Sequence, residues 1–197
     1  MASIHAYQNR ETRFTSNSVA LGGGIVRNNV TTMLDAEGSD CTLNGLSLAT
    51  GTQLIDNHTT IDHAKPHCTS HELYKAILDG KAHGVFNGKI FVRQDAQKTD
   101  AKQTNKTLLL SENAVIDTKP QLEIFADDVK CTHGATVGQL DTDQVFYLRT
   151  RGIDEIMAQD ILTFAFAEDV VSRIHVEPLK EKLESLVHEK LGKGRKS

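Results

Sequence analysis

Residues 122–152, LEIFADDVKCTHGATVGQLDTDQVFYLRTRG, decide the fold class because the spacing of apolar residues changes within them. Up to about Gly138, apolar and polar residues alternate, which is typical of a β-strand, and after it the spacing becomes helical. Successive side chains of a strand point to opposite sides. One face of a strand over residues 129–137 would carry Val129, Cys131, His133, Ala135 and Val137. The stretch therefore predicts a mainly β region followed by helices.

Residues 15–138 show short extended segments of the same kind, such as Val30, Thr32 and Leu34, separated by glycine and asparagine. No convincing amphipathic helix interrupts them, which argues against a doubly wound α/β sheet. A sandwich, a barrel or a β-solenoid remains. We find no strict repeat period, which counts mildly against a regular solenoid. Asn87-Gly88, between two apolar pairs, is typical of an antiparallel hairpin.

The C-terminal part predicts three helices. Asp141 offers an N-cap for a short helix that stops at Gly152. A second helix is expected over residues 154–174, and a third opens at Glu177-Pro178 and ends before Gly192. We therefore expect a β core over residues 1–140, a helical subdomain over 141–192 and a disordered tail over 193–197. The second helix is apolar around most of its circumference, so it is either wholly buried or pressed against a partner.

Composition excludes several classes of function. The chain has 197 residues, 39% of them hydrophobic and 24% charged, as in ordinary globular proteins. A net charge of −4 argues against nucleic acid or an anionic membrane as the main partner. Three widely separated cysteines make no disulfide framework. No segment resembles a signal peptide or a membrane span. We expect a soluble cytoplasmic protein.

Cys131 and His133 are a pair of soft-metal ligands on one strand face. Their Cα atoms would lie about 6.5–7 Å apart, whereas metal–ligand bonds are only about 2.0–2.3 Å long. Because a strand restrains both side chains, the pair is better suited to supply one or two ligands to a centre that another chain completes. The alternative is that Cys131 is a small buried apolar residue and His133 a hydrogen-bonded interior histidine.

A second candidate is the histidine-rich stretch DNHTTIDHAKPHCTSH, residues 56–71. Pro66 rules out a regular helix that would place His63 and His67 side by side. The stretch is either structural or the site of a metal-dependent β-helix enzyme acting on carbohydrate, a competing hypothesis whose site residues would be Asp56, His58, His63 and His67. The chain has no Trp and only three Tyr for stacking against sugars. No P-loop or nucleophile–base motif is present.

Several motifs together resemble the SufD branch of the SufB/SufD family, which assembles iron–sulfur clusters in the SUF system. They are DHAKPH at 62–67, SHELYKAIL at 70–78, FNGKI at 86–90, QKTDAKQTNKTLLLS at 97–111 and the block quoted above. After His133 this chain has Gly134-Ala135-Thr136, where SufB proteins usually have Glu-Ala-Thr. The resemblance covers about residues 14–171. Family members have a further N-terminal region, so we expect this chain to be a C-terminal fragment.

The resemblance implies a right-handed parallel β-helix, in which Asn87-Gly88 would be a corner, followed by helices that dock the SufC ATPase. It also implies that His133, with Cys131 beside it, lies where SufB pairs with this chain and a cluster is assembled. We expect a non-catalytic scaffold without a cofactor of its own, which holds a transient cluster in the complex and forms a homodimer when isolated. The expected SufC contacts are Ile156, Met157, Ile161, Phe164 and Phe166.

Overall fold

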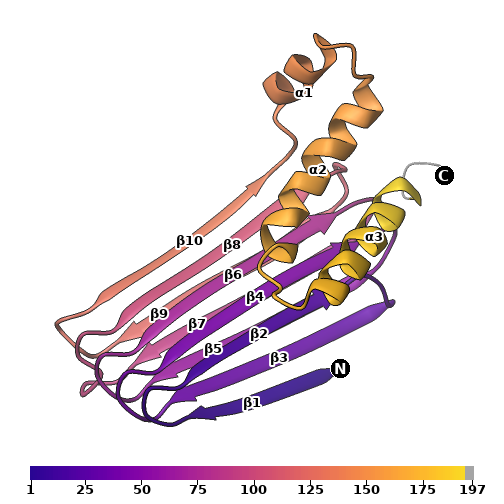
Figure 1. Cartoon of the computed structure of the whole chain (residues 1–197). Helices are drawn as coiled ribbons and strands as arrows, with labels where there is room; N and C mark the ends of the chain where they lie inside the picture. The colour runs from indigo at the N-terminus through magenta and orange to yellow at the C-terminus, as the bar shows by residue number, and fades with distance from the viewer. Residues whose placement is uncertain (194–197) are drawn as a thin grey trace.

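The computed structural model describes residues 1–193, which form ten strands and three helices (Figure 1). The strands are β1 (Ala2–Gln8), β2 (Arg13–Ala20), β3 (Ile25–Leu34), β4 (Asp40–Ala49), β5 (Leu54–His63), β6 (Thr69–Leu78), β7 (His83–Val92), β8 (Asp100–Leu109), β9 (Val115–Ile124) and β10 (Lys130–Gly138). The helices are α1 (Thr142–Arg149), α2 (Glu155–Val171) and α3 (Glu177–Lys193).

Successive strands enter two facing sheets in turn. Sheet A has the order β1-β3-β5-β7-β9 and sheet B the order β10-β8-β6-β4-β2, with all neighbours parallel. Each turn of chain adds one strand to each five-stranded sheet, so the strands form a β-solenoid of five turns. The predicted parallel β-helix with C-terminal helices is confirmed. Ala2 pairs with Asn28 but His83 with Val115, so the length of a turn varies and the sequence shows no strict period.

Two Asn-Gly pairs lie inside strands, where the sequence predicted breaks. Asn87-Gly88 is in the middle of β7 and is neither a hairpin nor a corner, and Asn44-Gly45 is in the middle of β4. Both glycines face the narrow interior. A Cβ atom at Gly45 would come within 2.2 Å of the Tyr74 ring. A Cβ at Gly88 would meet the Phe86 ring at 2.6 Å. These glycines therefore make room for aromatic side chains rather than for a turn.

The corners of the solenoid fall at other glycines. Gly51 and Gly80 occupy equivalent corners on neighbouring turns, joined by a hydrogen bond of 2.7 Å from the N–H of Lys81 to the carbonyl of Gly51. Their φ angles of 63° and 69° lie in the left-handed region that favours glycine. Gly80 thus separates β6 from β7, whereas Gly84 lies within β7.

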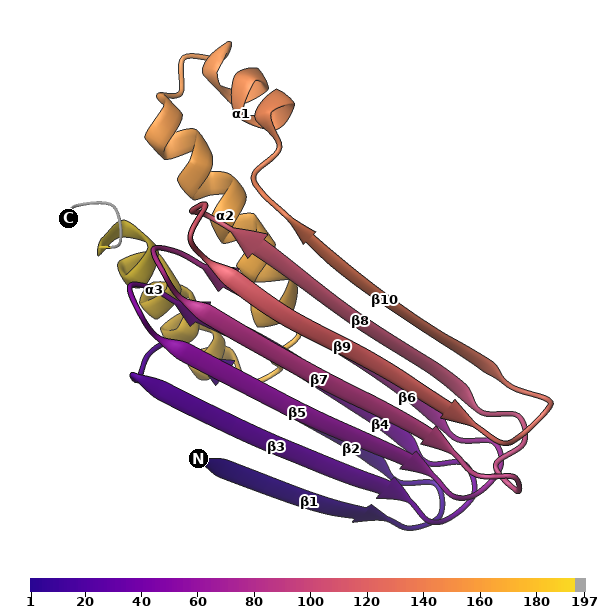
Figure 2. The same cartoon turned by 180° about the vertical axis from the view of Figure 1, so that it is seen from behind.

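The helices α2 and α3 cover the outer face of sheet B, and α1 lies beyond the ends of the strands (Figures 1 and 2). Asp154 caps α2 by accepting a hydrogen bond of 3.0 Å from the N–H of Met157. The outward residues Leu46, Leu73 and Ile77 of sheet B pack against Val170 of α2 and its neighbours. The buried Lys75 attaches α2 to sheet B, because its Nζ lies 2.6 Å from Oδ2 of Asp169.

The helix bounds differ from prediction at two ends. α2 ends at Val171, three residues early, and α3 continues through Gly192 to Lys193. Leu183 and Leu191 pack beside the buried Val187, whereas Leu179 and Leu186 are exposed. Apart from Lys193, the tail predicted for residues 193–197 lies outside the described residues.

Candidate functional site at the end of the solenoid

The strand β10 ends sheet B and determines the surroundings of Cys131 and His133. The prediction of a strand over residues 129–137 is confirmed. Within residues 1–193, β10 pairs along one edge only, with β8 (Figure 2). Its other edge is a template for pairing with another chain, because backbone N–H and C=O groups there have no neighbouring strand. We call the end of the solenoid formed by β9 and β10 the open end.

Burial decreases along the face of β10 that carries the predicted ligands. Cys131 is partly buried and, with Val129 and Leu122, packs against the core between the sheets. His133, by contrast, is exposed. The reason is that sheet A ends at β9, so no further strand covers this face of β10 within the described chain. The structure therefore places one candidate ligand at the core boundary and the other at an exposed surface.

Burial raises the pKa of the Cys131 thiol, and a backbone hydrogen bond involving Ala101 opposes part of that rise. Because the thiolate is the form that binds metals, a metal at Cys131 must displace a proton. The imidazole of His133 is exposed. Of the two side chains, His133 is the more accessible first ligand.

A second exposed surface lies on α1 and the first half of α2. Phe146 is 66% exposed, Ile156 63% and Met157 52%. The apolar patch consists of Phe146, Tyr147, Ile156, Met157 and Ile161, all exposed. The patch therefore contains three of the five residues predicted to contact an ATPase partner.

The other two predicted contacts, Phe164 and Phe166, are occupied within the chain. Phe164 stacks on His188 of α3 with ring centroids 3.7 Å apart. Phe166 packs in the cluster between α2 and sheet B, with Nζ of Lys75 4.4 Å from its ring centroid. The exposed aromatic side chains of this region are instead Phe146 and Tyr147 of α1. The sequence signal that could have found these two is a pair of adjacent aromatics on a helix of only eight residues.

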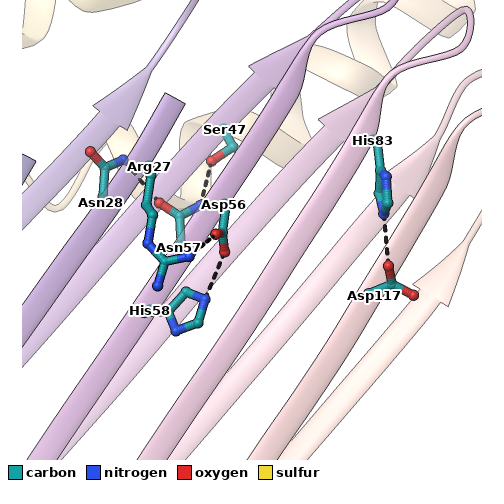
Figure 3. A network of polar contacts seen from close by, with 8 residues as sticks. All are labelled: Arg27, Asn28, Ser47, Asp56, Asn57, His58, His83 and Asp117. Atoms are coloured by element: carbon teal, nitrogen blue, oxygen red, sulfur yellow. Dashed lines mark hydrogen bonds and ion pairs between the residues drawn. The ribbon is translucent and has the colours of Figure 1, made fainter. Parts of the chain in front are cut away.

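The histidine-rich stretch does not form one site; two of its residues, Asp56 and His58, are drawn in Figure 3. Asp56 and His58 lie on the outer face of sheet A, where the Asp56 carboxylate contacts His58 at 2.9 Å and Arg27 at 2.7 Å. His63 points into the core, and His67 lies at an exposed corner with a φ of 58°. The four residues proposed for a carbohydrate enzyme are therefore spread over the outer face, the interior and a corner.

The buried His63 has a structural role. Its Nε2 lies 2.9 Å from Oγ of Ser70 on the facing sheet. Burial lowers the pKa of His63 to about 4, which keeps the ring neutral. A similar pair on the outer face, His83 and Asp117, joins β7 to β9 at 2.7 Å (Figure 3). These histidines connect strands and sheets rather than gathering around a ligand.

The side chains and helices of the described residues limit the kind of site. Across residues 1–193, no three side chains of the His, Cys, Asp and Glu types gather where they could hold a metal ion. Within the same range, no helix has both the length and the apolar character needed to cross a membrane. Cys41, Cys68 and Cys131 are free thiols.

Comparison with known proteins connects this geometry to a family. Residues 1–166 match the family described as SUF system FeS cluster assembly, SufBD core domain. The chain is 44% identical, over 91% of its length, to the iron–sulfur cluster assembly protein SufD of Escherichia coli. It is 40% identical over 95% of its length to a SufBD family protein of Synechocystis, and 32% identical over 97% to one of Mycobacterium leprae. It spans 42%, 41% and 51% of these three relatives, respectively.

Proposed function

This chain belongs to the SufBD family of the SUF iron–sulfur cluster assembly system, and from that membership we propose that it is a non-catalytic scaffold subunit. A SufB subunit would pair with it at the open end, where a nascent cluster would be bound by both chains. The observation that carries the proposal is the exposed His133, beside Cys131, on a strand with one unpaired edge. Free thiols suit the reducing cytoplasm in which we place the protein.

The chemistry of the open end suits a shared centre. Imidazole and thiolate are both ligands of iron in clusters, but a cluster commonly needs four protein ligands. The open end offers His133 and, after loss of its proton, Cys131. The remaining ligands would come from the partner. Pairing along the free edge of β10 would bring the partner's side chains next to His133, since adjacent strands lie about 4.8 Å apart.

The apolar patch is the proposed docking surface for the SufC ATPase. Ile156 and Met157 lie on the part of α2 farther from Lys75 and Asp169, and Phe146 lies on α1. Exposed apolar patches of this kind mark contact surfaces. The sequence contains no P-loop motif, so ATP hydrolysis would take place on the partner.

Replacing the proposed ligand tests the function. We expect His133→Ala to leave the circular dichroism spectrum and melting temperature unchanged, because the side chain is exposed. Cluster formation from ferrous iron and sulfide with SufB and SufC should fall at least about tenfold, as expected on removal of one ligand or its support. Thr132→Ala, on the opposite face of β10, is the matched control. Normal cluster formation by a folded His133→Ala variant would rule out the proposed role.

A further inference from the structure

Three polar side chains form a row across the inner face of sheet B. Glu72 of β6 is in register with Gln103 of β8, and Gln103 is in register with His133 of β10. Residues paired in this way point to the same side of a parallel sheet. Glu72 is 2% exposed and Gln103 1%, whereas His133 is the exposed member. The row therefore connects the core of the solenoid to the open end.

The carboxyl group of Glu72 fixes the direction of the Gln103 amide. Nε2 of Gln103 donates a hydrogen bond of 2.7 Å to Oε2 of Glu72. Since the amide nitrogen donates to Glu72, the amide oxygen Oε1 is the atom of Gln103 that is left to accept from another donor. This oxygen is buried and has no hydrogen-bond partner. An unpaired buried carbonyl oxygen is costly, so the position favours a donor from the neighbouring strand.

His133 of β10 is in register with Gln103, and a ring N–H of its imidazole can donate a hydrogen bond. Adjacent parallel strands are about 4.8 Å apart, so rotation of the imidazole brings a ring N–H within reach of Oε1. Histidines that bind metals usually donate their second ring N–H to such an acceptor, which fixes the tautomer. We propose that Gln103, held by Glu72, is the positioning residue that accepts this N–H and directs the other ring nitrogen of His133 to the open end. The inference rests on the proposed function and adds residues to its site.

The surroundings of the amide fit this role. Burial raises the pKa of Glu72 to about 7, against the effect of hydrogen bonds from Thr59 and Gln103. Either protonation state of the carboxyl group keeps an oxygen that can accept from Nε2 of Gln103. Gly88 leaves space for the same nitrogen, because a Cβ atom there would lie 2.5 Å from it. In its ionised form Glu72 only accepts, so it holds Nε2 of Gln103 and not Oε1.

The tautomer of His133 tests the inference without any cluster. In ¹⁵N-labelled chain, we expect long-range ¹H–¹⁵N spectra to show one dominant neutral tautomer of His133. Gln103→Met keeps the length of the side chain but removes the acceptor, and should give a mixture of tautomers. Thr107→Val is the matched control, because Thr107 is another buried residue of β8 with an unpartnered oxygen, in register with Val137 instead. An unchanged His133 tautomer in Gln103→Met would overturn the inference.

A double variant that exchanges the two side chains controls for general damage to the fold. Glu72→Gln combined with Gln103→Glu keeps the net charge and gives His133 an acceptor again, so the single tautomer should return. If Gln103→Met does not fold, Glu72→Gln alone takes its place, since an amide at position 72 no longer fixes the direction of Gln103. A mixture of His133 tautomers in the double variant, or a single His133 tautomer in Glu72→Gln alone, would contradict the proposed role of Glu72 and Gln103.

Cluster formation separates this inference from the proposed function. We expect Gln103→Met to slow assembly from ferrous iron and sulfide with SufB and SufC by about tenfold or more. If His133→Ala lowers assembly and Gln103→Met does not, the positioning role fails while the proposed function stands. If His133→Ala has no effect, the proposed function fails, and the tautomer spectra still decide whether Gln103 orients the ring.

Discussion

A methyl group has no room at Gly45, where an added Cβ atom would lie 2.2 Å from the Tyr74 ring. That ring lies against Phe86 in a tilted arrangement, with centroids 5.2 Å apart, so it cannot move aside without disturbing a second aromatic ring. We expect Gly45→Ala to lower the free energy of unfolding by about 1–3 kcal/mol, as overpacking typically does. Urea denaturation measures the change.

Gly134→Ala provides the control, because no atom lies within 4 Å of the position at which its Cβ would stand. This second variant should be neutral or slightly more stable. Equal stability of Gly45→Ala and wild type would show that the interior of the solenoid is wider than described.

Glu72 makes the stability of the chain depend on pH. Its pKa is raised from 4.5 to about 7 in the folded protein, so the folded state binds a proton that the unfolded state has lost. The stabilisation that the protonated Glu72 adds to the folded state is present below pH 4.5 and disappears as the pH rises through 7. Glu72→Gln removes this pH-dependent stabilisation. The difference in unfolding free energy between wild type and Glu72→Gln should therefore change by about 3 kcal/mol across this range.

His63 acts with the opposite sign, since its pKa is lowered to about 4, but both proteins contain it and its effect cancels in the difference. Denaturation curves at several pH values provide the measurement. A difference that is constant with pH would mean that Glu72 is not buried as a titrating carboxyl group.

At the scale of elements, the apolar patch predicts where the ATPase binds. Met157→Glu and Ile161→Glu each place a charge on the exposed part of α2 and should weaken SufC binding at least about tenfold, because a buried unpaired charge is costly. Ile25→Glu is the control, since Ile25 is 78% exposed but begins β3, away from the helices. Calorimetric titration measures the affinity. Unchanged SufC binding by both α2 variants would rule out the apolar patch as the SufC-binding surface.

The sequence predicted those elements that depend on local signals. Asp141 caps α1 as predicted, because its contact with the N–H of Asp143 spans only two residues. The sequence did not show that Asn87-Gly88 lies within a strand. One of the side chains that leave no room for a Cβ atom at Gly88 is Gln103, which is fifteen positions away in the sequence. Phe164 and Ile156 look alike in sequence, and only the position of α3 distinguishes the packed residue from the exposed one.

The candidate site was predictable in part. The alternation of β10 and the family resemblance together pointed to Cys131 and His133, and the structure places the latter at an exposed position. Glu72 and Gln103 gave no signal, because about thirty residues separate each member of the row from the next. Only the register between parallel strands brings such residues together.

For the whole molecule, the open end predicts self-association when no partner is present. We expect the isolated chain to dimerise through the free edge of β10, as unprotected edge strands do. Ala135→Lys puts a charge on the exposed face beside that edge and should give monomers. Thr15→Lys, on β2 at the opposite edge of sheet B, should leave the dimer intact. Light scattering at several concentrations distinguishes these outcomes, and a monomeric wild type would contradict the expectation.

Lys75 has a mechanical consequence. Its ammonium group donates a hydrogen bond of 3.0 Å to the carbonyl of Phe166 and contacts Asp169, so the second half of α2 is tied to β6. The first half of α2 carries three residues of the apolar patch and lies beyond these contacts. A force applied to the first half of α2 would act on β6 through Lys75, and β6 also carries Glu72 on its other face, three residues before Lys75. A partner that moved α2 on binding the patch would therefore act on the strand in which the polar row to His133 begins.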